Sequence, residues 1–263
     1  MTDVLIIIQA RTGSTRFPEK VLQPLLGIPL LHRMIERVKL SKYGNHVVVA
    51  TTWLPNDDII AHQMISLGQQ YYRGHPYDLL DRHYNIAREY NAQHIVKIPS
   101  DCPLIDPEVI NYVIDYYLNN QPNLDYAGNV FQPSWPDGND VEIFSFTALE
   151  QAYFNAKEKY QREHTTPYIY KNDQLFKIAN VNNPSGGYEL YQHYRLTLDY
   201  PEDFEVIRMT FNNLFPKNPQ FGWNEIVEFL KENPEINAIN AKYHSKSWMN
   251  DHYSKTPIEK YTR

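Results

Sequence analysis

Cysteine and long apolar runs are both scarce in this sequence. A single cysteine, Cys102, occurs among 263 residues, which excludes an intramolecular disulfide and is typical of a reducing compartment. The N-terminal apolar run, Val4–Ile8, is short, with no basic residues before it and no small-residue cleavage site after it, which argues against a signal peptide. No stretch approaches the length of a membrane span. We therefore expect a cytoplasmic protein without a membrane partner.

A surplus of basic residues is also missing. The formal net charge is −6, which argues against a nonspecific nucleic-acid binder, because such proteins need a cationic surface. A small nucleotide needs only a local cationic pocket and is still allowed. The sequence shows no internal repeat, coiled-coil pattern or low-complexity tract. Its length is enough for one large α/β domain, with or without an inserted segment.

Alternating strand and helix patterns fill the first half of the chain. Runs of β-branched residues predict buried strands, and apolar residues at helical spacing predict the helices between them. The strands are expected at Val4–Ile8, Val47–Thr51, Gln70–Tyr72 and His94–Ile98, and the helices at Pro29–Leu40, Asp57–Gly68, Tyr77–Tyr90 and Asp106–Asn119. This alternation predicts an α/β fold in three layers, with a mainly parallel sheet covered on both faces.

The pattern changes after about Asp125. Strands are expected at Val141–Phe144, Phe176–Val181 and Tyr194–Leu198, and helices at Thr147–Lys159, Asp203–Leu214 and Asn224–Asn233. We expect one domain over residues 1–240, made of a nucleotide-binding half (1–128), an inserted segment (129–192) and a return to the core (193–240), followed by a polar tail (241–263).

A cationic loop follows the first predicted strand. It contains Arg11, Arg16 and Lys20 around the Gly13–Ser14 pair. Ligands of open α/β sheets bind beyond the carboxyl ends of the strands, and arginine and lysine suit phosphate groups. The loop matches neither G-x-x-x-x-G-K-[ST] nor G-x-G-x-x-G. We favour a triphosphate site here over the alternative, which is a solvated surface loop.

Two aspartates follow other predicted strands. Asp101 lies in Ser100–Asp106 (SDCPLID), and Asp199 ends the apolar stretch Tyr194–Leu198. One or two carboxylates with nucleotide phosphates and water are the usual ligands of Mg²⁺. Asp101 could instead be a turn residue before Pro103, and Asp199 could cap the next helix. Asp106 and Asp203 are better explained as helix caps.

These motifs together resemble the cytidylyltransferase family. A-R-x-x-S-x-R-x-P-x-K, S-D-C-P-L-I-D and L-T-L-D-x-P-E-D carry the resemblance, and VVVAT, R-G-x-x-x-D-L-L-D-R, D-V-E-I-F-S-F-x-A-L-E-x-A and R-E-H-T-T-P-Y-I-Y extend it from Ile6 to about Glu205. That family includes the CMP-Kdo and CMP-sialic acid synthetases, and its branch named for the spore coat polysaccharide biosynthesis protein SpsF is the most similar. The resemblance implies a Rossmann-like, GT-A-like nucleotide-diphospho-sugar transferase fold. It also implies CMP transfer from CTP to a sugar acid or sugar phosphate, with release of pyrophosphate, for surface polysaccharide synthesis.

The resemblance also implies roles for individual residues. Arg11, Ser14 and Lys20 would contact the triphosphate, with Gly13 and Arg16 beside them, and Asp101 and Asp199 would hold Mg²⁺ or Mn²⁺. The backbone at Gln9 and Ala10 would meet the base, and the weaker nucleotide-side candidates are Arg73, Asp78, Asp81 and Arg82. Lys20, Arg11 and Asp101 would be the catalytic groups, acting by positioning and charge neutralisation rather than through a covalent intermediate.

The acceptor side is expected in the inserted segment, which in this family also contacts the partner of a homodimer. The candidates there are Arg162, His164, Trp135 and Tyr188. His164 could bind the acceptor or act as a base, or it could be a structural histidine at an interface. Cys102 is expected to be a small packing residue, since no catalytic partner is evident.

Two other functions stay open from the residues. A glycosyltransferase on the same fold would use a nucleotide-sugar donor, but the Asp-x-Asp motif common in such enzymes is missing, because Cys-Pro follows Asp101. A binding protein that has lost catalysis would be expected to lose Lys20, Asp101 and Asp199, and all three are present.

Overall fold

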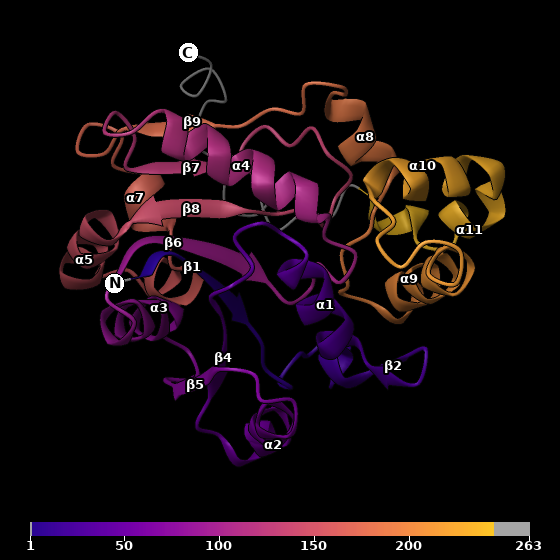
Figure 1. Ribbon diagram of the computed structural model, residues 1–263, viewed down its shortest axis with the longest axis horizontal. Coiled ribbons are helices and arrows are strands. Elements are labelled where there is room, and N and C mark those ends of the chain that lie inside the picture. Colours follow the sequence, from indigo (N-terminus) through magenta and orange to yellow (C-terminus); the bar gives the residue numbers. More distant parts are fainter. Residues whose placement is uncertain (1, 245–263) are drawn as a thin grey trace.

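A seven-stranded sheet forms the centre of the computed structural model, which describes residues 2–244. The strand order is β5-β4-β1-β6-β8-β7-β9, and the first four strands run parallel (Figure 1). β8 is antiparallel to both β6 and β7, and β9 is parallel to β7. The strands are β1 (Thr2–Gln9), β4 (Val47–Thr52), β5 (Tyr71–Gly74), β6 (Ala92–Pro99), β7 (Tyr126–Gly128), β8 (Glu142–Ser145) and β9 (Ile178–Asn180). The expected mainly parallel sheet is therefore confirmed.

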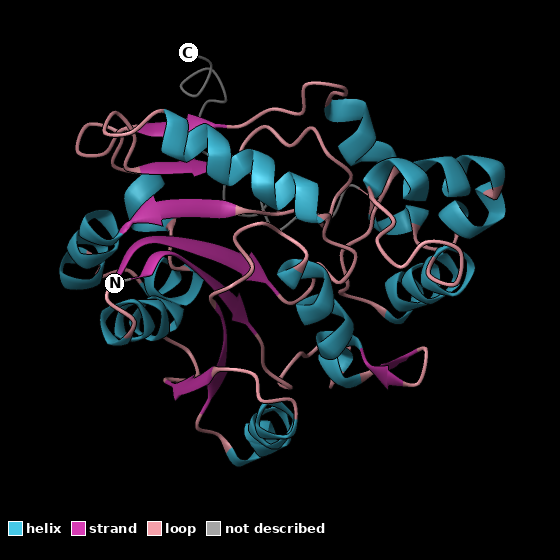
Figure 2. Ribbon diagram, viewed as in Figure 1, coloured by secondary structure: helices cyan, strands magenta, loops and turns pink. Residues whose placement is uncertain are grey.

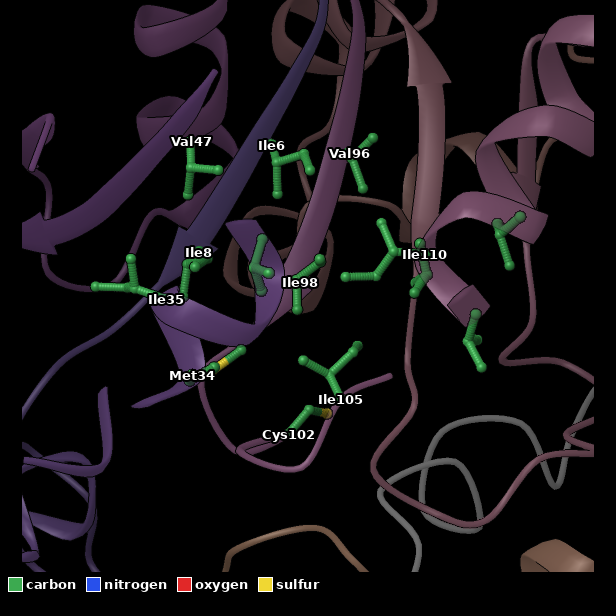
Figure 3. Packing of buried hydrophobic residues seen from close by; sticks show 14 of the residues in the cluster. Ile6, Ile8, Met34, Ile35, Val47, Val96, Ile98, Cys102, Ile105 and Ile110 are labelled. Carbon is green, nitrogen blue, oxygen red and sulfur yellow. The ribbon is translucent and has the colours of Figure 1, made fainter. Parts of the chain in front are cut away.

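Helices cover both faces of this sheet (Figure 2). β1 shows why, because Ile6 and Ile8 pack into one core cluster while Leu5 and Ile7 pack into another. The first cluster contains apolar residues of α1 (Leu30–Lys39), α2 (Asp58–Ser66) and α4 (Pro107–Asn119), and Figure 3 shows part of it. The second contains residues of α3 (Leu79–Glu89), α5 (Phe146–Asn155) and α7 (Pro167–Tyr170). The three expected layers follow from this alternation.

A third apolar cluster involves the helices α9 (Pro201–Leu214), α10 (Trp223–Glu232) and α11 (Pro234–Ala238), which lie beside the sheet in Figure 1. It packs these helices against Leu196 and Leu198. The expected strand Tyr194–Leu198 is wrong, since only Arg195 forms an isolated bridge, to Asp137. The backbone N–H groups of Leu196 and Leu198 instead donate to the carbonyls of Asp137 and Asp101, so this segment is tied to loops.

Short elements complete the described chain. They are η1 (Lys20–Leu22), β2 (Pro24–Leu25), β3 (Ile28–Pro29), η2 (Pro55–Asp57), α6 (Lys159–His164), α8 (Tyr188–His193) and η3 (Ala241–Tyr243). Asp106 caps α4, as expected, because its carboxylate accepts the Glu108 N–H. Of the polar tail, residues 245–263 lie outside the described part. Between residues 2 and 244, no helix is long and apolar enough to cross a membrane.

Candidate active site

A cavity of about 570 Å³ opens where β1 and β6 end. Gln9 and Pro99 are paired in register at the last position of these neighbouring parallel strands, and both line the cavity. The loop that follows β1 provides Arg11, Arg16 and Lys20 to the wall. The site thus lies at the carboxyl edge of the parallel strands, where ligands of open α/β sheets bind.

The loop after β1 is fixed by a buried carboxylate. Asp57, at the start of α2, accepts the backbone N–H and the hydroxyl of Thr12, each at 2.7 Å, and also the hydroxyl of Thr52. Arg11 donates to the carbonyl of Pro76 at 3.1 Å, which joins the loop to the segment before α3. The sequence interpretation gave Asp57 no such role, since the predicted helix simply began there. These bonds hold the cationic loop against the sheet.

Lys20 lies between two carboxylates that are far apart in the sequence. Its Nζ is 3.1 Å from Oδ1 of Asp199 and 3.8 Å from Oδ2 of Asp101. It also donates to the carbonyl of Leu198 at 2.5 Å, and its side chain is only 12% exposed. The cationic loop, the end of β6 and the stretch before α9 therefore meet at one point.

Cations surround Asp199 more closely than Asp101. Arg16 lies 2.7 Å from Asp199, and the buried Arg195 lies 3.3 Å from it. Burial tends to raise the pKa of Asp199, but Lys20 and Arg16 outweigh it and hold that pKa below its ordinary value. Burial raises the pKa of Asp101, Lys20 opposes the rise and Asp199 adds to it. The two carboxylates thus differ in how readily they take up a proton.

Several charged groups of the cavity were missed by the sequence interpretation. Asp137 and Asp140 line it beside β8; burial raises the pKa of Asp137 to about 7, against the pull of Arg195, and raises that of Asp140 well above its ordinary value. Lys97 and Glu142 form a buried ion pair at the cavity wall.

The Pro-Asp-Gly stretch before β8 is the sequence signal that could have drawn attention to Asp137. Gly138 has φ 102°, and a Cβ there would lie 2.7 Å from the Leu196 carbonyl carbon, so the turn requires glycine.

The comparisons with known proteins agree with this geometry. The family model described as cytidylyltransferase matches residues 5–241. The chain belongs to the cytidylyltransferase family. An uncharacterized protein of Methanocaldococcus jannaschii is 40% identical over 247 residues, which cover 93% of this chain and 97% of that protein. The spore coat polysaccharide biosynthesis protein SpsF of Bacillus subtilis is 30% identical over 242 residues, 89% and 97% of the two chains. The predicted family resemblance is confirmed.

Solved structures show the same architecture. A cytidylyltransferase from Leptospira borgpetersenii is 35% identical and superposes with a TM-score of 0.83, over 90% of this chain and 97% of that one. CMP:2-keto-3-deoxy-manno-octonic acid synthetase, solved with CTP, superposes with a TM-score of 0.62 at 15% identity, over 81% and 99% of the two chains. The second likeness bears on the fold alone. The predicted nucleotidyltransferase architecture is confirmed.

Most of the predicted nucleotide-side residues of this cytidylyltransferase share the cavity. Its lining includes Gln9, Ala10, Arg11, Gly13, Ser14, Arg16, Lys20, Arg82, Asp101 and Asp199. Arg73, Asp78 and Asp81 do not line it. Arg73 is 2.5 Å from Asp58 of α2 and donates to the Thr52 carbonyl at 2.9 Å. Its guanidinium therefore links β5 to α2 and to the end of β4. Asp78 caps α3 by accepting the Asp81 N–H.

The predicted acceptor residues separate. His164 lines the cavity, next to Glu163. Trp135 is contradicted as an acceptor residue, because it is 4% exposed in the core and packs against Tyr112. Arg162 does not line the cavity, since its guanidinium is taken up by Asp78 and by the Tyr153 carbonyl. Tyr188 is exposed on α8, outside the cavity lining.

The carboxylates of the cavity fit a hard divalent cation. Asp101 and Asp199 provide oxygen donors, and contact with the same Lys20 ammonium places them near one another. Mg²⁺ usually takes one or two protein carboxylates and fills its other positions with water and phosphate. Within the described residues, no group of three or more His, Cys, Asp or Glu side chains is arranged to hold a metal ion. A cation bound here would therefore share its ligands with the substrate.

Proposed function

We propose that this cytidylyltransferase transfers CMP from CTP to a sugar acid or sugar phosphate and releases pyrophosphate, in the synthesis of a surface polysaccharide. The single observation that carries this proposal is the meeting of Lys20 with Asp101 and Asp199 in a cavity whose other wall is the cationic loop after β1. Family membership supports cytidylyl transfer, and similarity to SpsF supports a polysaccharide pathway.

The chemistry suits the charges of the cavity. An acceptor oxygen attacks the α-phosphorus of CTP in line, the bond to the β-phosphate oxygen breaks, and pyrophosphate leaves with that electron pair. Arg11, Arg16 and Lys20 offset the negative charge that grows on the leaving group. Asp101 and Asp199 would hold Mg²⁺, which supplies further charge neutralisation at the phosphates. No side chain has to form a covalent bond to the substrate.

In this in-line reaction, the acceptor approaches the α-phosphate from the side opposite the leaving pyrophosphate. Glu163 and His164 line the cavity and are the acceptor-side groups we propose. An anomeric or phosphate oxygen is already a competent nucleophile, so the reaction asks little of a base. His164 then serves mainly to orient the acceptor.

A pyrophosphate-release screen tests the proposal. CTP, UTP, ATP and GTP are each combined with Mg²⁺ and a panel of sugar acids and sugar 1-phosphates that includes 3-deoxy-manno-octulosonate. We expect release with CTP and one acceptor class, and none from Asp101→Asn. Asp115→Asn is the matched control, because Asp115 pairs with Lys42 on the surface. Release of a nucleoside diphosphate from a nucleotide sugar would instead identify the glycosyltransferase alternative.

Homodimerisation stays a prediction for this protein. Light scattering coupled to size-exclusion chromatography measures the mass of the particle directly. A mass of twice the 31.0 kDa chain would support it, and a monomer mass would contradict it.

A further inference from the structure

Helix α6 carries Glu163 and His164 to the cavity wall, yet it has no buried side chain. An isolated helix of six residues is unstable in water, because nucleation costs more than so few hydrogen bonds return. Apolar burial does not fix its place either. Two contacts at its C-terminal end tie it to α3.

The first contact is an ion pair. Nε of Arg162 lies 2.5 Å from Oδ2 of Asp78, the residue that caps α3. The same guanidinium donates to the Tyr153 carbonyl at 3.0 Å. Asp78 and Arg162 thus join the last turn of α6 to the start of α3, next to Leu79, which lines the cavity.

The second contact is a strained turn. Thr165 follows α6 with φ 71° and ψ −60°, and the Thr166 N–H donates to the His164 carbonyl at 2.9 Å. These values define a γ-turn of the rare kind with positive φ, which a β-branched residue adopts only under constraint. Thr165 is fully buried. A folded protein keeps such strain where its surroundings over-determine the conformation, often beside a functional site.

His83 of α3 supplies part of that constraint. Its Nδ1 lies 2.9 Å from the Leu79 carbonyl and 3.4 Å from Oγ1 of Thr165. A carbonyl only accepts, so Nδ1 carries the proton. Burial lowers the pKa of His83 to about 3, which keeps the ring neutral. The neutral His83 ring therefore contacts Thr165 from α3 and helps to hold the turn in place.

We propose that Thr165, Asp78 and Arg162 are positioning residues that lock α6 onto α3 and thereby hold Glu163 and His164 against the acceptor in the cavity. The word acceptor rests on the proposed cytidylyl transfer, whereas the lock itself does not. The lock also gives Asp78 and Arg162 a role without direct contact with either substrate.

Two substitutions at Thr165 separate the turn from the side chain. Thr165→Pro forbids positive φ, and Thr165→Gly permits it without strain. The histidine ring signals of ¹⁵N-labelled protein report on His164, assigned by their loss in His164→Gln. Calorimetry gives the Kd of CTP with Mg²⁺, and pyrophosphate release gives the KM of the acceptor that turns over fastest in the panel.

We expect Thr165→Pro to shift the His164 signals and raise the acceptor KM at least tenfold, with the Kd of CTP changed less than threefold. Thr165→Gly keeps the turn and loses only the Oγ1 contact with His83, so its acceptor KM should rise less than that of Thr165→Pro, with the Kd of CTP within threefold of the wild type. Asp78→Asn keeps a capping side chain but loses the ion pair, so we expect shifted His164 signals and a three- to tenfold higher acceptor KM. Asp115→Asn is the control.

Unchanged His164 signals and acceptor KM in Thr165→Pro and Asp78→Asn would overturn the lock. An equal loss of CTP affinity would also overturn it, because the turn would then support the whole cavity. If Thr165→Pro does not fold, Asp78→Asn decides. If the wild type turns over no acceptor, the proposed function fails, and the His164 signals alone decide the lock.

Discussion

Lys20→Ala removes the ammonium group that contacts both Asp101 and Asp199. In the substrate complex that we propose, the same group faces the triphosphate, so the substitution should lower turnover strongly. The fold should survive, because Lys20 lies at a cavity wall rather than in an apolar cluster. Burial already raises the pKa of Asp101, so its carboxyl can take up a proton once the lysine is gone.

The expected loss follows from the distances. Unit charges about 4 Å apart attract by about 4 kcal/mol at the effective dielectric of a protein surface, and Lys20 lies 3.1 and 3.8 Å from the two carboxylates. A phosphate oxygen at a similar distance would be attracted to Lys20 by a similar energy, reduced by the cost of removing water from the ammonium group. Removing one charge-stabilising donor from an active site typically costs about 10²- to 10³-fold in kcat, or about 2.7–4 kcal/mol. We expect a loss in that range.

Pyrophosphate release at saturating CTP and acceptor measures this loss, and thermal unfolding checks the fold. Lys42→Ala is the matched control, because Lys42 pairs with Asp115 on the surface. The control should keep its full rate. A rate for Lys20→Ala within fivefold of the wild type, with the fold intact, would refute the placement of Lys20 at the reacting phosphates.

Two further predictions concern stability. Glu142→Gln leaves the buried Lys97 ammonium without its ion-pair partner, so it should lower the free energy of unfolding in urea by about 3–5 kcal/mol. Glu205→Gln, in a more exposed pair with Arg208, is the control and should lower it by less than about 1 kcal/mol. Equal losses in the two variants would contradict the buried pair. The pKa of His83 is about 3 in the folded protein against 6.5 when unfolded. Below pH 6.5 the unfolded chain therefore binds the extra proton, and the contribution of His83 lowers stability by about 1.4 kcal/mol per pH unit toward pH 3. His83→Leu should flatten this fall, and the same slope in both proteins would count against a neutral buried ring.

Much of the fold could be predicted because its signals are local. The β-branched run in β1 alternates its side chains between two faces, and both faces are buried, so the run reads as a central parallel strand. The start of α4 also has a local signal, because Asp106 is a capping residue and Pro107 occupies the first helical position. The strand predicted at Tyr194–Leu198 was wrong because alternating apolar residues do not reveal whether the N–H groups of a segment meet a strand or a loop.

The site was predictable only in part. The cationic loop and the two aspartates carry charge at the ends of apolar runs, which is a signal within the sequence. Trp135 and Arg162 gave a misleading signal, since an aromatic or a cationic side chain can be satisfied inside the protein as well as by a ligand. The buried state of Asp137 and Asp140 depends on β8 lying beside β6, which no local pattern specifies.

The sequence by itself determined the alternation of strands and helices, and placed Lys20, Asp101 and Asp199 after apolar segments. Only the tertiary structure decided that these segments converge, because convergence depends on strand order and on loops tied by groups such as Asp57. The same holds for the turn at Thr165, whose strain is maintained by contacts with α3. Charge and periodicity are properties of neighbours in the chain, whereas a site is a property of neighbours in space.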